Sequence, residues 1–135
     1  MIFIAVCPDE YISILYQNRH SVHPLNDGIN ITMLRKYQYL KARCAILETD
    51  DQLEMGKWMG IFLSFRWDTE IVSSDEWMDY FGLYPDDPED QINHWVSIVK
   101  LKYPMMSVRP DNYEAILAAC YLHDREERAK RAVFA

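Results

Sequence analysis

The stretch from Trp67 to Val99 most constrains how this chain can fold, because it holds nine carboxylates and no lysine or arginine. Unpaired carboxylates are very costly away from water, so the stretch cannot be wholly buried. Large aromatic side chains stand among the acids, and such side chains commonly anchor binding surfaces. The sequence therefore predicts an acidic, aromatic surface. The carboxylates are Asp68, Glu70, Asp75, Glu76, Asp79, Asp86, Asp87, Glu89 and Asp90, and the aromatics are Trp67, Trp77, Tyr80, Phe81, Tyr84 and Trp95.

The charge of the chain is unevenly distributed. The net charge is −7, but residues 48–99 carry two basic and thirteen acidic groups, whereas residues 1–47 and 100–135 each have a net charge of +2. A field of this sign disfavours nucleic acid and favours a basic partner at the middle segment. A solvated acidic face that only maintains solubility is the alternative.

The hydrophobic pattern predicts a mostly α-helical α+β protein, in which residues 1–135 form one compact globular domain with at most a small sheet. Residues 1–6 are apolar and β-favouring, which predicts a short N-terminal strand. A helix is expected over about residues 9–18 and a surface loop over 18–30. Apolar residues at three- and four-residue steps predict an amphipathic helix over 31–47.

Capping and turn residues divide the C-terminal half into short elements. Residues 68–72 are predicted to form a strand that pairs with residues 1–6. The helix capped by Ser74 is expected to end at Gly82, and the helix after it is expected to end before Pro104. The four predicted helices cover about residues 50–64, residues 75–81, residues 88–103 and the chain from residue 110 onward.

The cysteines and the apolar runs bear on the expected compartment. The apolar runs are shorter than the roughly 20 residues of a bilayer span, and the N-terminus lacks the features of a secretory signal. Cys7, Cys44 and Cys120 are an odd number at wide spacings, which is typical of buried free thiols. We expect a cytoplasmic protein without membrane contact.

The motifs that carry chemistry are weak. His20 and His23 could hold a metal only with two further ligands, and the pattern supplies no second pair. The dipeptide His123-Asp124 is used by metal-dependent phosphohydrolases, but no aspartate follows it, so an ion pair between Asp124 and Arg128 is the preferred interpretation. The sequence therefore predicts no catalytic residue, no metal and no cofactor.

The leading hypothesis is a small, acidic, non-enzymatic protein-binding protein that occupies a basic surface of another protein, including a surface that normally holds nucleic acid. Phage-encoded anti-defence inhibitors and toxin-neutralising immunity proteins share this bulk character, as an analogy only. The expected partner-binding residues are Trp67, Asp75, Glu76, Asp79, Tyr80, Tyr84, Asp86, Asp87, Glu89 and Asp90.

Two other hypotheses stay open. The first is a structural or assembly component that forms a homo-oligomer through exposed aromatics, and the second is a small metal-dependent hydrolase. Among the aromatics, Trp77 is the expected core anchor because aromatic side chains stand three and four residues after it. Trp67 and Tyr84 are the expected external contacts. Direct contact with nucleic acid is disfavoured, because Glu126 and Glu127 offset the basic residues near the C-terminus.

Overall fold

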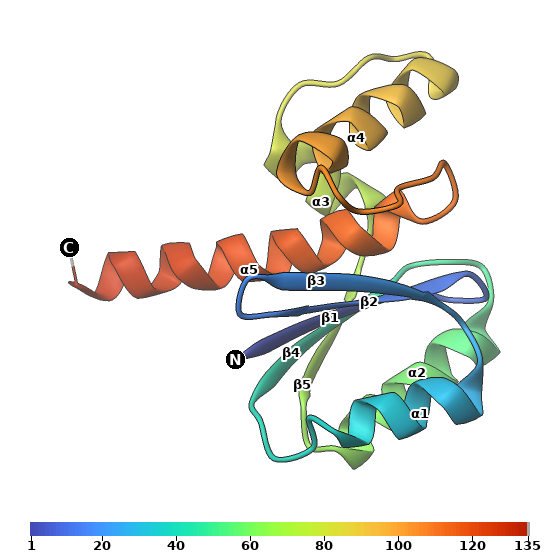
Figure 1. The fold of residues 1–135 in the computed structure, drawn as a ribbon, viewed down its shortest axis with the longest axis vertical. Coiled ribbons are helices and arrows are strands. Elements are labelled where there is room, and N and C mark those ends of the chain that lie inside the picture. The colour runs from blue at the N-terminus through green and yellow to red at the C-terminus, as the bar shows by residue number, and fades with distance from the viewer. Residues whose placement is uncertain (135) are drawn as a thin grey trace.

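The computed structural model describes residues 1–134, which form a five-stranded mixed sheet with helices on both faces (Figure 1). Helices account for 50% of the chain and strands for 22%, so the prediction of a mostly helical protein with at most a small sheet is wrong. The fold is α+β. The elements are β1 (Ile2–Cys7), β2 (Tyr11–Tyr16), β3 (Arg19–Pro24), α1 (Asp27–Arg35), β4 (Ala42–Leu47), α2 (Gln52–Ser64), β5 (Asp68–Val72), α3 (Ser74–Phe81), α4 (Pro88–Lys102) and α5 (Tyr113–Phe134).

The strands lie in the order β3-β2-β1-β4-β5, with the N-terminal strand at the centre. β1 is antiparallel to β2 and parallel to β4, β2 is antiparallel to β3, and β4 is parallel to β5. Residues 1–6 and 68–72 are strands as predicted, but β5 pairs with β4 and not with β1. The helices α1 and α2 precede β4 and β5, and both lie on the same face of the sheet (Figure 1).

The helix predicted over residues 9–18 is wrong, because this stretch turns sharply and returns as β2. Cys7 pairs with Tyr11 across a three-residue loop in which Asp9 has a φ of +69°, and Glu10 N donates to Cys7 O at 3.0 Å. A loop of this length with one residue in the left-handed region is a common hairpin connection. The run after it is rich in β-branched residues, which suits a strand.

The predicted loop at residues 18–30 and the predicted helix at 31–47 are also wrong in part. A two-residue turn at Gln17 and Asn18 leads into β3, which is the edge strand of the sheet. Asn26 then caps α1 by accepting a hydrogen bond from Ile29 N. The chain leaves the helical conformation after Arg35 and enters β4, so the apolar spacing from Ile31 onward covers two different elements.

Side chains on alternate strand positions build two separate cores. On one face, Ile4 and Ile14 pack with Trp58 of α2. On the other face, α5 lies across β1, β2 and β4, and α3 and α4 pack against α5 (Figure 1). Every residue from Ala115 to Cys120 is buried, because this part of α5 is covered by the sheet and by the other two helices.

Helices in the C-terminal half lie close to their predicted places, with small changes in the caps. Ser73, not Ser74, caps α3 by accepting from Glu76 N, and Gly82 ends the helix as predicted. Asp87 caps α4, which ends at Lys102, two residues before Pro104. The last helix begins at Tyr113, three residues later than predicted.

All three cysteines are buried and free, which confirms that prediction. The Cys7 thiol donates to Glu10 Oε2 at 3.0 Å, and burial raises its pKa. A neutral thiol in this setting is not a nucleophile at neutral pH. Within residues 1–134, no helix is both long enough and apolar enough to cross a bilayer.

Candidate functional site

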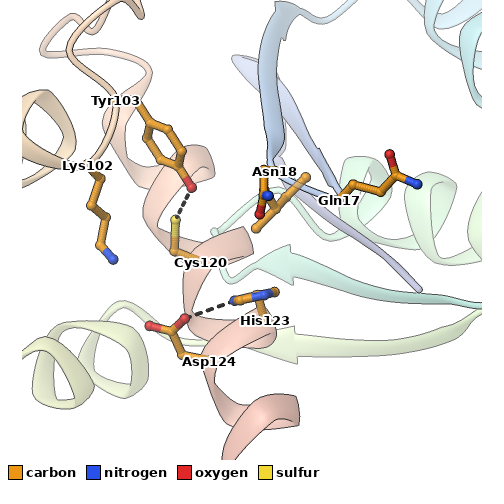
Figure 2. A pocket seen from close by; sticks show the side chains of 8 residues that line it. Gln17, Asn18, Lys102, Tyr103, Cys120, His123 and Asp124 are labelled. Atoms are coloured by element: carbon orange, nitrogen blue, oxygen red, sulfur yellow. Dashed lines mark hydrogen bonds and ion pairs between the residues drawn. The ribbon is translucent and has the colours of Figure 1, made fainter.

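A pocket of about 320 Å³ lies where the β2–β3 turn faces the end of α4 and the middle of α5 (Figure 2). We call it the hairpin pocket. Its walls come from three parts of the chain that are far apart in sequence, and they are brought together because α5 packs against the sheet while α4 packs against α5. The residues that line it are Leu15, Gln17, Asn18, Lys102, Tyr103, Cys120, His123 and Asp124.

One wall of the hairpin pocket contains a chain of polar contacts between neutral groups. Tyr103 Oη lies 3.3 Å from Cys120 Sγ, and Cys120 Sγ lies 3.9 Å from His20 Nδ1. The rings of His20 and Tyr103 pack edge to face at 4.9 Å between centroids. His20 Nε2 is buried and has no hydrogen-bond partner among the described residues.

Burial determines the protonation of these groups. Burial raises the pKa of Cys120 to about 11 and raises the pKa of Tyr103 well above its ordinary value. Burial, with His123 nearby, lowers the pKa of His20 to about 4. At neutral pH the thiol, the phenol and the His20 imidazole are therefore all uncharged, and the thiolate needed for nucleophilic catalysis is absent.

His123 and Asp124 lie one turn further along α5 than Cys120, on the same face of the helix. His123 Nδ1 lies 3.0 Å from Asp124 Oδ1, and the His123 ring packs edge to face against Phe3 of β1. The predicted ion pair between Asp124 and Arg128 is wrong, because the Arg128 guanidinium lies over the Tyr80 ring at 4.7 Å. Both side chains of the His-Asp pair are half-buried at the pocket rim.

Residues of the type that bind metals do not gather anywhere in residues 1–134 in a group of three or more that could hold an ion. His20 and His23 lie in β3, not in a loop, and His20 contacts Cys120. Among the described residues, His20 and His23 are therefore not joined by the further ligands that a metal site would need.

The acidic stretch singled out in the sequence is spread over β5, α3, the following loop and α4. Two of its nine carboxylates lie within ion-pair distance of an arginine, although the Asp68 side chain is 81% exposed. Arg125 donates to both oxygens of Glu70 at 2.7 and 2.6 Å, and Arg43 lies 3.9 Å from Asp68. The other seven carboxylates are exposed, and they are Asp75, Glu76, Asp79, Asp86, Asp87, Glu89 and Asp90.

The aromatic residues of the stretch are mostly inside. Trp67 is 3% exposed, donates to Leu40 O and stacks on Phe65, so the prediction that Trp67 is an external contact is wrong. Trp77 is fully buried, which confirms it as a core anchor.

Tyr80 and Tyr84 lie between these extremes, because both are half-buried. Tyr80 packs against Phe81 and Tyr121, and Tyr84 packs against Trp95 at 5.4 Å between ring centroids. Each of the two tyrosines can therefore contribute only part of its ring to a partner.

Sequence reasoning missed the hairpin pocket as a site. It considered His123 and Asp124 as a dipeptide, but it could not place them beside Lys102, Gln17 and Asn18. The contact between His20 and Cys120 joins residues that are 100 positions apart, so no local spacing signals it. A scan against models of known protein families gave no match, and neither did a search of curated proteins.

Proposed function

We propose that this chain is a non-enzymatic protein-binding protein that presents an acidic surface to a basic surface of another protein. The acidic surface consists of the seven exposed carboxylates of α3, the α3–α4 loop and the first turn of α4, together with Leu83 and Tyr84. Among the described residues, none of the seven forms an ion pair. Their charge is therefore available to a partner.

The observation that carries this proposal is a shallow hollow of about 540 Å³ in the middle of the acidic surface. Its lining combines the carboxylates of Asp79 and Asp86 with the Tyr84 ring and with Leu83, which is 97% exposed. An arginine side chain of a partner suits such a hollow, because its guanidinium pairs with carboxylates and stacks on aromatic faces.

The two kinds of group contribute differently to binding. Long-range attraction between opposite charges speeds the encounter and orients the partners, whereas buried contacts at the centre of an interface supply most of the affinity. In this proposal, the seven carboxylates accelerate association and Leu83 and Tyr84 slow dissociation. An inhibitor that covers a nucleic-acid-binding surface in the cytoplasm is one protein that would work in this way.

The test has two steps. A photo-crosslinking amino acid at position 83 first identifies the protein that contacts the hollow in the native host. Binding kinetics to the purified partner are then measured for the wild type, for the double variant D79N/D86N and for the control E48Q/D50N. The control removes two exposed carboxylates outside the acidic surface.

We expect D79N/D86N to lower the association rate about tenfold at low salt, with a smaller effect near 0.5 M salt, where exposed charges are screened. The control should behave as the wild type. Equal association rates for all three proteins would exclude the acidic surface from the mechanism.

Assembly of identical chains is a second candidate, because large apolar side chains are strongly exposed on α4 and in the loops on either side of it. Leu83, Leu101 and Met105 are 97%, 83% and 98% exposed. Light scattering distinguishes the two functions. A dimer in the wild type that becomes a monomer in Leu83→Asp would favour assembly over binding of a different protein.

A further inference from the structure

The hairpin pocket presents one cation and one anion that are not paired with each other. Lys102 of α4 and Asp124 of α5 both line it, and Figure 2 shows Lys102 to the left of Cys120 and Asp124 below it. Burial is the main cause of the raised pKa of Cys120, and the two charges act on that pKa in opposite directions. Lys102, Asp124 and the Cys120 thiol therefore border the same pocket.

Each charge lacks a full ionic partner within residues 1–134. No carboxylate lies within ion-pair distance of Lys102, whose Nζ stands 5.9 Å from the centroid of the Phe81 ring. Within residues 1–134, the only group at ion-pair distance from the Asp124 carboxylate is the His123 imidazole, which is a cation only when it is protonated. A ligand that carries both charges could satisfy both groups at once.

Neutral polar groups complete the mouth of the pocket. Gln17 and Asn18 form the β2–β3 turn. Neither side chain forms a hydrogen bond within residues 1–134. Each primary amide has two donors and one acceptor oxygen. Figure 2 shows the Gln17 side chain pointing away from Lys102 and Asp124, so it is the Asn18 amide that can donate to a ligand carboxylate or accept from a ligand ammonium group.

Beyond Tyr103 the hairpin pocket continues into an adjoining hollow of about 400 Å³. Asn18, Lys102 and Tyr103 line both spaces, and the far part is formed by Pro104, Met105 and Met106. Thioether and proline side chains favour apolar groups and offer no charge. His20 also lines this hollow, and Met105, which is 98% exposed, stands at its open side, so the far part is less polar than the mouth but open to solvent.

We propose that the hairpin pocket binds a free α-amino acid with an apolar side chain of medium size, such as leucine. The ligand carboxylate pairs with Lys102, the ligand ammonium group pairs with Asp124, and the side chain enters the hollow formed by Pro104, Met105 and Met106. A volume of about 320 Å³ is within the usual range for small-molecule pockets. This proposal is independent of protein binding by the acidic surface.

The first experiment compares leucine with two analogues that each lack one charge, by calorimetry on the full chain. Isoamylamine lacks the carboxylate, and 4-methylpentanoate lacks the ammonium group. We expect leucine to bind with a Kd of about 1 mM or lower and each analogue to bind at least about tenfold more weakly, because each loses a charge-assisted contact. Glutamate and lysine should also bind more weakly than leucine, because their charged ends would enter the apolar hollow.

Two variants then assign each charge to its residue. In Lys102→Met, leucine should lose its advantage over isoamylamine, and in Asp124→Asn it should lose its advantage over 4-methylpentanoate. Lys100→Met and Asp50→Asn are the matched controls, because both residues are exposed and neither lines the pocket. Circular dichroism checks that each variant is folded.

Three results would overturn the proposal. The first is the absence of binding heat and of any rise in melting temperature with about 10 mM leucine, since a ligand at roughly ten times its Kd stabilises the folded state measurably. The second is equal binding of leucine and either analogue to the wild type. The third is an unchanged preference for leucine in both variants.

Discussion

Trp77 of α3 and Trp95 of α4 pack edge to face in the core, with 5.1 Å between ring centroids and an interplanar angle of 69°. Both indoles are fully buried, although both belong to the most acidic stretch of the chain. The exposed carboxylates of α3 and α4 lie on the other side of these helices. The stretch is thus divided into an aromatic inner layer that stabilises the fold and an acidic outer layer that is exposed to solvent.

Replacing Trp77 with alanine should lower the free energy of unfolding by about 3 to 5 kcal/mol, because the change leaves a large cavity between α3, α4 and α5. Urea denaturation measures the loss. Leu83→Ala is the matched control and should change stability by less than about 0.5 kcal/mol, since this side chain is on the surface. A stable Trp77→Ala variant would contradict the role of the tryptophan pair.

Asp87 and Asp86 are neighbours with different roles. Asp87 Oδ1 accepts hydrogen bonds from Glu89 N at 3.0 Å and from Asp90 N at 3.1 Å, so it caps α4. Asp87→Ala should cost about 1 kcal/mol of stability, the usual value for a lost N-cap, and Asp86→Ala should cost much less. Thermal unfolding of the two variants checks this, and equal losses would show that the cap contributes nothing.

The ion pair between Arg125 and Glu70 joins α5 to the edge strand β5. Its geometry is bidentate, but both side chains are 38% exposed, so solvent weakens the pair. We expect a coupling energy of at most about 1 kcal/mol in a double-mutant cycle with Glu70→Gln and Arg125→Met, and a smaller value in 1 M salt. A coupling energy that does not change with salt would contradict a charge-based contact.

His20 should make the stability of the protein depend on pH. Burial lowers the pKa of the folded-state imidazole to about 4, from the ordinary histidine value of about 6.5. Between these values the unfolded chain takes up a proton that the folded chain does not, so stability is complete above pH 6.5 and falls as the pH is lowered towards 4. The loss attributable to His20 is at most about 3 kcal/mol.

Urea denaturation of the wild type and of His20→Gln at several pH values between 4 and 7 isolates this effect. As the pH is lowered from 7 to 4, the wild type should lose more stability than His20→Gln, because only the wild type has the buried His20 imidazole. A difference in stability that stays constant with pH would mean that His20 has the same pKa in the folded and the unfolded protein, and would contradict the prediction. Burial also lowers the pKa of His23, whose Nε2 lies 2.9 Å from Ser21 Oγ. The variant His23→Gln therefore provides a second comparison.

Local signals in the sequence determined the elements of the C-terminal half. Gly82 ends α3, Pro88 stands in the first turn of α4, and carboxylates gather at the start of both helices, where they stabilise the helix dipole. The central strand β1 could also be predicted, because a short β-branched apolar run is typical of a buried strand. The exposure of the seven carboxylates could also be predicted from the sequence, because unpaired carboxylates must contact water.

Tertiary contacts decided the rest. The run Tyr11–Tyr16 became a strand because the turn at Asp9 returns it to β1, where its backbone groups find partners and Ile12 and Ile14 meet the core. Trp67 became a core residue because Phe62 of α2 and Phe65, which directly follows that helix, pack beside it. The hairpin pocket exists only because α5 crosses the sheet and brings Asp124 towards Lys102 and the β2–β3 turn. Pairing and packing over such separations leave no periodic signal along the chain, so only the folded structure could reveal this site.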